Sequence, residues 1–192
     1  MPGPALKLAT IADLLSLPDD LRAELIEGQI VPKPEAGARH GRAQGAVARF
    51  VGGPFDTDDG HGGPGGWWIL TETLVGFPPQ CYRPDLAGWR RERLPDPAVQ
   101  TPIVMIPDWC CEVLSPGPRN AARDRVQKRN DYARHGVKHY WLVDPDARVI
   151  EALELESGGA WRECGAWDED AREARIPPFE MIALDLSRFF LP

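Results

Sequence analysis

Residues 109–114 read Trp-Cys-Cys-Glu-Val-Leu, and this apolar stretch decides the fold. A nearly continuous apolar run of this length is typical of a strand that is covered on both faces of a sheet. Residues 115–118, Ser-Pro-Gly-Pro, end the strand. Side-chain alternation places Glu112 on one face with Cys110 and Leu114. An ionised carboxylate there costs several kcal/mol unless it is paired or binds a cation. Glu112 is therefore a functional residue, the partner of an arginine or a residue at the edge of the sheet.

The chain beyond this strand predicts a helical crossover to a second strand. Asn120 is a suitable N-cap for a helix that runs to His135, and Gly136 follows at the position where helices commonly end. Lys138–Val143 has the apolar character of the next strand. The order strand, helix, strand indicates a mixed α/β fold. Further strands are expected at Val149–Leu155 and Trp161–Trp167, and a short helix or turn at Leu186–Phe190.

The chain before residue 109 predicts an N-terminal helix and a hairpin. Thr10 caps a helix that reaches Leu17, with Asp13 at the third position. Leu21–Pro32 has two short apolar stretches around Gly28, which favours a tight turn. A second helix is expected at Ala36–Val51, a loop at Gly52–Gly66, strands at Trp67–Gly76 and Arg83–Trp89, and a further loop at Arg90–Pro107.

Length and composition suit one domain over residues 1–192, with 43% hydrophobic and 27% charged residues. No apolar run approaches the roughly 18–20 residues that span a membrane. Met1–Leu17 lacks the apolar core of a signal peptide, so a cytoplasmic protein without membrane contact is expected. The four cysteines show no CxxC pair and predict reduced, apolar residues and no zinc site.

The net charge of -7 argues against a protein that coats nucleic acid non-specifically. The charge is uneven, however. Residues 119–148 hold eight basic and four acidic residues, whereas residues 151–192 hold four basic and ten acidic residues. The middle of the chain is therefore able to face a polyanion, although a solvated helix face explains the same pattern.

The predicted helix before Gly136 carries three polar residues along one stripe. Asp124, Lys128 and Tyr132 are spaced four residues apart. An ion pair between Asp124 and Lys128 is a sufficient explanation for two of them. A lysine that faces the strand carboxylates is instead suited to orient a water or to stabilise charge on a phosphate.

Several ordered motifs resemble a known family. The sequence is similar to the Uma-two family of restriction endonucleases, within the PD-(D/E)XK nuclease superfamily, over about residues 10 to 190. The resemblance lies mainly between Tyr82 and Pro145. It is carried by RPDLAGW at 83–89, CEVLSP at 111–116, D-x-x-x-K-x-x-x-Y at 124–132, HGVKHYWLVDP at 135–145, RAELIEGQIV at 22–31 and the pair Arg39-His40.

This resemblance implies a restriction-endonuclease-like mixed central sheet flanked by helices, preceded by a helix and a hairpin. It implies Asp85 and Glu112 as metal-holding carboxylates, with the Val113 carbonyl as a further ligand. The lysine of the superfamily's usual E-x-K motif would fall at Leu114, and the resemblance implies that in this family the basic residue lies on the helix instead, as Lys128. The remaining implied residues are Glu24 as the early acid, Glu27 as its alternative, and His40 and Tyr132 as auxiliaries.

The function implied is a Mg²⁺- or Mn²⁺-dependent endonuclease that hydrolyses DNA and acts as a homodimer. Mg²⁺ favours sites with a few carboxylates and several waters. One alternative is a catalytically inactive nucleic-acid-binding or interaction protein that retains the fold. Another is purely structural: Asp85 and Glu112 are then held by Arg83 or Arg123, with carboxylates that point apart.

Overall fold

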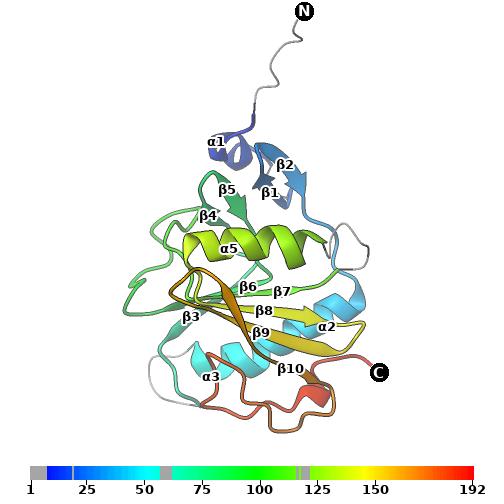
Figure 1. Ribbon diagram of the computed structural model, residues 1–192. Helices are drawn as coiled ribbons and strands as arrows, with labels where there is room; N and C mark the ends of the chain where they lie inside the picture. The colour runs from blue at the N-terminus through cyan, green and yellow to red at the C-terminus, as the bar shows by residue number, and fades with distance from the viewer. Residues whose placement is uncertain (1–7, 19, 57–61, 116, 118–121) are drawn as a thin grey trace, which may run out of the picture.

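A six-stranded sheet forms the centre of the computed structural model, which describes residues 8–18, 20–56, 62–115, 117 and 122–192 (Figure 1). The strand order is β10-β9-β8-β7-β6-β3. Only β7 and β8 pair in parallel among these neighbours, and the other pairs are antiparallel. The bounds are β3 Trp67–Thr71, β6 Leu86–Arg90, β7 Trp109–Val113, β8 His139–Asp144, β9 Val149–Leu155 and β10 Trp161–Asp168.

The apolar stretch at residues 109–114 forms an interior strand, as predicted. Every residue of β7 is buried. The crossover to β8 runs through a π-helical segment, η2 Arg123–Lys128, and then α5 Arg129–His135. Gly136 ends α5 with a left-handed φ of 82°, the conformation that glycine adopts most readily. The predicted cap Asn120 lies outside the described residues.

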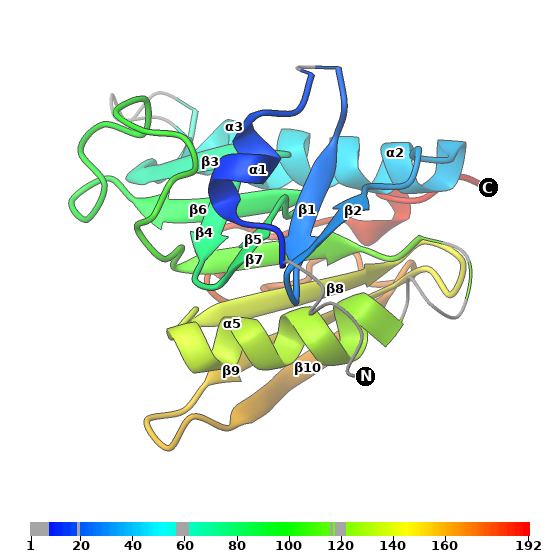
Figure 2. The ribbon, with the colours of Figure 1, turned by 90° about the horizontal axis from the view of Figure 1, so that it is seen from above.

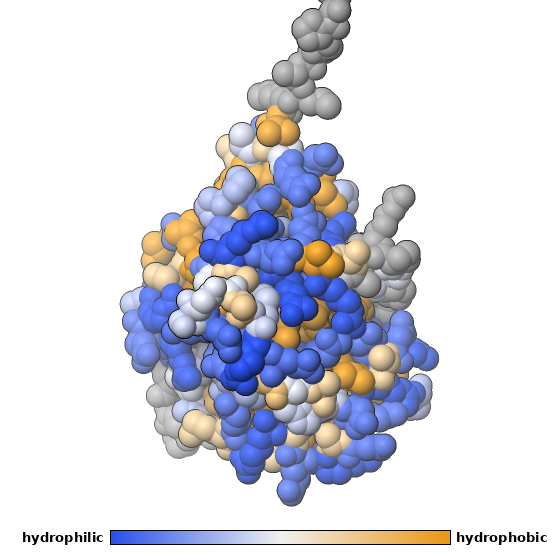
Figure 3. Space-filling view, in the orientation of Figure 1, coloured by the Kyte–Doolittle hydropathy of each residue, from blue (hydrophilic) through white to orange (hydrophobic). Residues whose placement is uncertain are grey.

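The two faces of the central sheet are covered by different elements, because side chains alternate along each strand. Cys111 and Val113 of β7 pack in the cluster that contains α2 and the C-terminal segment. Cys110 and Leu114 pack in the cluster that contains α5. Figure 1 shows α5 above β7 and β8 and α2 below them, and Figure 2 looks down on the sheet from the side of α5. The face of the molecule seen in Figure 1 is mainly hydrophilic, with scattered hydrophobic residues (Figure 3).

A second, four-stranded sheet lies beside α5 on the same face of the central sheet and carries the N-terminal hairpin (Figure 2). The predicted hairpin is confirmed, and Glu27 and Gly28 turn it with φ angles of 49° and 72°. Thr10 and Asp13 form the expected capping box at the start of the first helix. The strand order is β2-β1-β5-β4, with α1 Ile11–Leu15, β1 Ala23–Ile26, β2 Gln29–Pro32, β4 Val75–Phe77 and β5 Gln80–Tyr82.

Two strand predictions were wrong in their bounds. The single strand expected at Trp67–Gly76 is two strands, β3 and β4, in different sheets. Glu72 separates them with a positive φ of 54°. The strand expected from Arg83 begins only at Leu86, so Asp85 lies in the bend before β6. At both positions the chain crosses from one sheet to the other. Such a crossing depends on tertiary packing, which local strand propensity does not encode.

The second predicted helix is longer than expected. It consists of α2 Ala38–Val47, the π-helical η1 Ala48–Gly52 and α3 Gly53–Phe55. The prediction of a loop from Gly52 was therefore wrong for its first four residues. Val51 and Phe55 are buried against the sheet, and Pro54 falls in the first turn of α3, where a backbone N–H is not needed.

The C-terminal segment ends in a short 3₁₀ helix, η3 Leu186–Arg188, close to the predicted position. Leu186 and Phe189 are buried in the α2-side core. Within the described part of the chain, no helix has the length and apolar character that crossing a membrane requires.

Candidate active site

Charged side chains from both sheets line a small cavity near the end of β7. Its volume of about 20 Å³ accommodates about one water molecule. Such a concentration of buried charge is unusual for a cavity of this size. The charged lining residues are four carboxylates, Glu24, Asp85, Glu112 and Asp124, and three cations, Lys33, Arg123 and Lys128, with His40 beside them.

Asp85 is held on both of its carboxylate oxygens. Oδ2 accepts a hydrogen bond of 2.6 Å from the Val113 N–H. Oδ1 lies 2.8 Å from Lys33 Nζ and 3.3 Å from His40 Nε2. Burial raises the pKa of Asp85, but the hydrogen bond from His40 and the charge of Lys33 outweigh it, so the pKa lies well below its usual value. Asp85 is therefore an ionised ligand-type carboxylate.

Glu112 projects from β7 toward the helical crossover, on the face that alternation predicted. The Tyr132 hydroxyl donates to its Oε1 at 2.6 Å, and Lys128 Nζ lies 3.0 Å from Oε2. Burial raises the pKa of Glu112 to about 8, although Lys128 opposes the shift. A bound cation would favour the ionised form of this carboxyl group.

Lys128 is the point on which the remaining carboxylates converge. Its side chain is 3% exposed, and Nζ lies 3.1 Å from Oε1 of Glu24 and 3.6 Å from Oδ1 of Asp124. Burial lowers the pKa of Lys128, but Glu112 and the other acids raise it well above the ordinary lysine value. The ammonium is therefore a fixed positive charge, and it contacts three carboxylates at once.

Lys33 is a site residue that sequence reasoning missed. It follows β2 directly, and Nζ lies 2.8 Å from each of three oxygens, on Glu72, Asp85 and the Arg83 backbone. Its position between Pro32 and Pro34 was a usable signal, because such a segment is extended and stiff. A lysine therefore stands next to Asp85 as well as next to Glu112.

His40 connects Asp85 to Ser115 at the edge of the cavity. It lies in the first turn of α2 and is buried. The Ser115 Oγ and the His40 Nδ1 are 3.3 Å apart, while Nε2 faces Asp85. His40, one of the auxiliary residues implied by the sequence, thus orients the carboxylate of Asp85, and the Ser115 hydroxyl lies at the other nitrogen of its ring.

Three further residues named from the sequence make other contacts than expected. Glu27 lies in the hairpin turn, where its N–H donates to Gln80 Oε1, and it does not line the cavity. Arg83 donates from its side chain to the Glu72 carbonyl, not to Asp85. Arg123 pairs with Glu24, at 3.9 Å, and not with Glu112. The structural alternative therefore named the wrong partners: lysines, His40, Tyr132 and a backbone N–H hold the two carboxylates.

The donor set suits a hard divalent cation by type. Carboxylate oxygens are the ligands of Mg²⁺ and Mn²⁺, and the Val113 backbone also lines the cavity. In this structure lysine side chains lie among these carboxylates. Among the described residues, no group of His, Cys, Asp or Glu is arranged to enclose a metal ion. The residues fit a metal chemically, and the two ammonium groups neutralise the carboxylates around the cavity.

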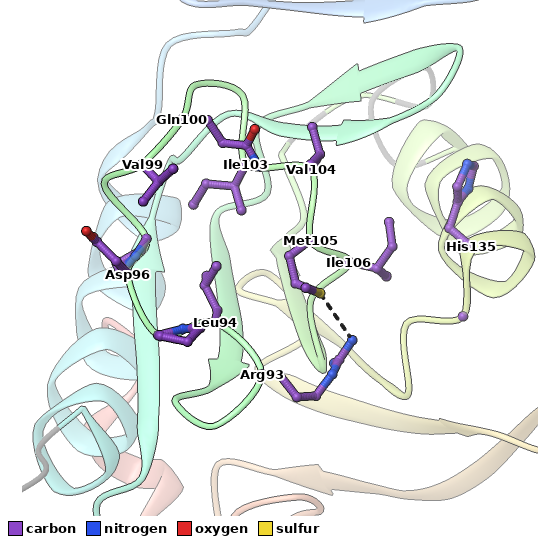
Figure 4. A pocket seen from close by; sticks show the side chains of 13 residues that line it. Arg93, Leu94, Asp96, Val99, Gln100, Ile103, Val104, Met105, Ile106 and His135 are labelled. Carbon is purple, nitrogen blue, oxygen red and sulfur yellow. Dashed lines mark hydrogen bonds between the residues drawn. The ribbon is translucent and has the colours of Figure 1, made fainter.

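A much larger cavity lies elsewhere in the described part of the chain. It has a volume of about 650 Å³ and is lined mainly by apolar side chains of the loop between β6 and β7 (Figure 4). Two of its polar side chains are already engaged, Arg93 with Asp108 and His135 with two backbone carbonyls. The small cavity, in contrast, is lined by four buried carboxylates and their cations.

The fold and the site define a class of protein. A mixed central sheet with a parallel β7–β8 pair, helices on both faces and carboxylates at the end of β7 is the restriction-endonuclease-like arrangement. A crystal structure described as "a putative nuclease belonging to DUF820", from Anabaena variabilis, has the same fold, with a TM-score of 0.74 at 20% sequence identity. The match covers 94% of this chain and 96% of that one.

The chain belongs to the Uma2 family, whose description is "Putative restriction endonuclease" and whose sequence model matches residues 11–187. This confirms the resemblance drawn from the motifs. No curated protein matches the chain.

Proposed function

We propose that this protein is a divalent-metal-dependent endonuclease that hydrolyses phosphodiester bonds of DNA. The observation that supports the proposal most is the convergence of Asp85, Glu112 and Glu24 with Lys128 on one cavity at the end of β7. Membership in a family described as restriction endonucleases agrees with it.

Asp85, Glu112 and the Val113 carbonyl would hold Mg²⁺ or Mn²⁺. When bound, the cation offsets charge on the transition state and lowers the pKa of a water molecule. His40 and the Val113 N–H fix the orientation of Asp85, and Tyr132 fixes that of Glu112. Lys128 contributes a permanent positive charge close to the position of a scissile phosphate.

A plasmid-nicking assay with Mg²⁺ or Mn²⁺ tests the proposal, beside calorimetry with Mn²⁺. Asp85→Asn and Glu112→Gln should each lower the nicking rate by roughly a hundredfold or more, since even outer partners of metal ligands matter up to that extent. Both variants should also bind Mn²⁺ more weakly.

Asp108→Asn is a matched control. Asp108 is a buried carboxylate paired with Arg93, but it does not line the cavity. Its variant should keep nicking and Mn²⁺ binding even if it is less stable. A wild-type protein that neither binds Mn²⁺ nor nicks DNA would overturn the proposal.

The second candidate is a non-catalytic nucleic-acid-binding protein with the nuclease fold. One observation favours it: lysine ammonium groups already neutralise the carboxylates. It predicts DNA binding that does not respond to Mn²⁺ and no nicking under any condition. Binding of Mn²⁺ with metal-dependent nicking would exclude it.

We also propose a homodimer that acts in the cytoplasm. Cleavage of both strands of a duplex by one centre per chain needs two copies, and the described cysteines are all free thiols, as in a reducing compartment. Sedimentation of the protein with and without duplex DNA would measure the assembly.

A further inference from the structure

A third cavity, with a volume of about 310 Å³, lies on the α2 side of the molecule between η1 and the C-terminal segment. It could hold the equivalent of roughly ten waters. Three arginines, Arg49, Arg172 and Arg188, line it together with Phe50. Asp185 is the one carboxylate in its described lining. It is therefore a positively charged pocket in a chain with a net charge of -7.

Two of these arginines have no acidic partner among the described residues. The guanidinium carbon of Arg188 lies 4.3 Å from the centre of the Phe50 ring, and that of Arg49 lies 5.5 Å from the same ring. No ion pair of either side chain occurs within the described part of the chain. Arg172 pairs with Asp185 at 3.2 Å. The aromatic ring thus holds two guanidinium groups at the pocket while their N–H donors stay available.

A line of arginines joins this pocket to the candidate active site. Arg39 and Arg42 are exposed on α2, and Arg42 donates to the Arg188 carbonyl. Arg39 precedes His40 and pairs with Asp146 at 3.2 Å. The rise of a helix places Arg49 roughly 14 Å from His40 along the axis. The helix therefore carries exposed basic residues from the position before His40 to the pocket.

We propose that the Arg49–Arg172–Arg188 pocket binds a backbone phosphate of the nucleic-acid strand. The guanidinium fork matches two phosphate oxygens, which makes arginine the preferred partner for this group. A strand carries one phosphate per roughly 3.4 Å of axis, so 14 Å corresponds to about four phosphates. The inference rests on the proposed function for the position of the cleaved phosphate, and the pocket holds a phosphate about four nucleotides away from it.

Binding without cleavage tests the pocket directly. Fluorescence anisotropy of a labelled 20-base-pair duplex in EDTA would give the binding constant at several salt concentrations. Arg49→Gln/Arg188→Gln should weaken binding of all sequences alike and should reduce the slope of log K against log salt by about 1, because one phosphate contact is lost. Arg49→Lys/Arg188→Lys should keep most of that slope.

Arg134→Gln is the matched control. Arg134 is an exposed arginine on α5, which covers the opposite face of the central sheet. Its variant loses one positive charge, as Arg49→Gln does, and should leave the slope unchanged. Because Arg188 packs more closely on Phe50 than Arg49 does, Arg49→Gln alone is the second variant, and it should lower the slope by less than the double variant while melting at the wild-type temperature.

A series of oligonucleotides tests the distance, and inorganic phosphate tests the ligand. Only oligonucleotides that extend more than about four nucleotides from the phosphate at the candidate active site should bind more weakly to the arginine variants. Inorganic phosphate should compete weakly, since it fills one contact. If phosphate binding depends on Arg49 and Arg188 while duplex binding does not, the pocket is a free-phosphate site and the proposal is wrong.

The outcomes separate this inference from the proposed nuclease activity. A wild-type protein that nicks DNA, with an arginine double variant that binds and nicks equally well, would overturn the pocket alone. A wild-type protein that never nicks but loses DNA affinity in the arginine variants would support phosphate binding by the pocket and would overturn the nuclease.

Discussion

The Nζ atom of Lys128 lies 3.0 Å from the Oε2 atom of Glu112, and both side chains are almost completely buried. Removing one partner of such a pair leaves an uncompensated buried charge. Lys128→Met should therefore lower the free energy of unfolding by about 3 kcal/mol in urea denaturation. Lys138→Met, which removes an exposed lysine, should change it by less than about 0.5 kcal/mol.

The same variant offers a test with metal. In Lys128→Met the carboxylates of Glu24, Glu112 and Asp124 lack their shared cation, so Mn²⁺ should raise the melting temperature more than it does in wild type. An equal shift in the two proteins would show that these carboxylates do not contribute to metal binding.

The Tyr132 hydroxyl supports Glu112 in a way that a phenylalanine cannot. Tyr132→Phe keeps the ring packing against Phe77 and Tyr140 but leaves Oε1 of Glu112 without its donor. We expect a loss of about 1–3 kcal/mol in stability, measured by urea denaturation, and slower nicking. Tyr140→Phe removes a hydrogen bond to the Asp124 carbonyl instead, and should leave nicking much less affected. Equal effects on nicking would contradict a specific role for Tyr132.

Gly88 lies between two tryptophan rings of the core. A Cβ at this position would be 3.0 Å from the Trp109 ring and 3.3 Å from the Trp67 ring. Gly88→Ala should therefore destabilise the protein by about 1–3 kcal/mol through overpacking. Gly41 lies in α2, and a Cβ at this position would point into open space. Gly41→Ala should therefore stabilise the protein by about 0.5–1 kcal/mol. Thermal melting of the two variants measures both signs, and a stable Gly88→Ala protein would contradict the packing.

His139 should make the stability fall in mild acid. Burial lowers the pKa of His139 below 6.5, although Glu154 and other acids oppose the shift, so the folded state keeps the neutral ring. Below pH 6.5 the unfolded chain then binds more protons than the folded protein does. The contribution of His139 to stability is therefore complete above that pH and is lost as the pH falls. Melting temperatures between pH 7.5 and 5 should decrease less in His139→Gln than in wild type. Parallel curves would exclude the effect.

The elements with strong local patterns could be predicted from the sequence. The apolar run of β7, the capping box at Thr10 and Asp13 and the glycine at the end of α5 each encode their structure within a few residues. The bounds around Glu72 and Asp85 could not be predicted in this way. The chain passes there from one sheet to the other, and the pairing partners lie far away in the sequence.

The site was predictable only in part for the same reason. Alternation along β7 identified Glu112, and helical spacing aligned Asp124, Lys128 and Tyr132. Family motifs added Asp85, Glu24 and His40. Lys33 was missed, because its contact with Asp85 depends on how the hairpin packs against the central sheet. No periodicity within the hairpin reports that packing.

The hairpin also determines how charge is distributed between the two sheets. It supplies Glu24 from β1 and Lys33 from the end of β2, one negative and one positive side chain. Glu112 and Lys128 form a second opposite pair on the central sheet and its crossover helix. Each lysine also contacts a carboxylate from the other side of the site, Lys33 with Asp85 and Lys128 with Glu24. Separating the hairpin from the central sheet would therefore leave Asp85 and Glu24 without these cations, and would remove Glu24 from the three carboxylates that stay beside β7.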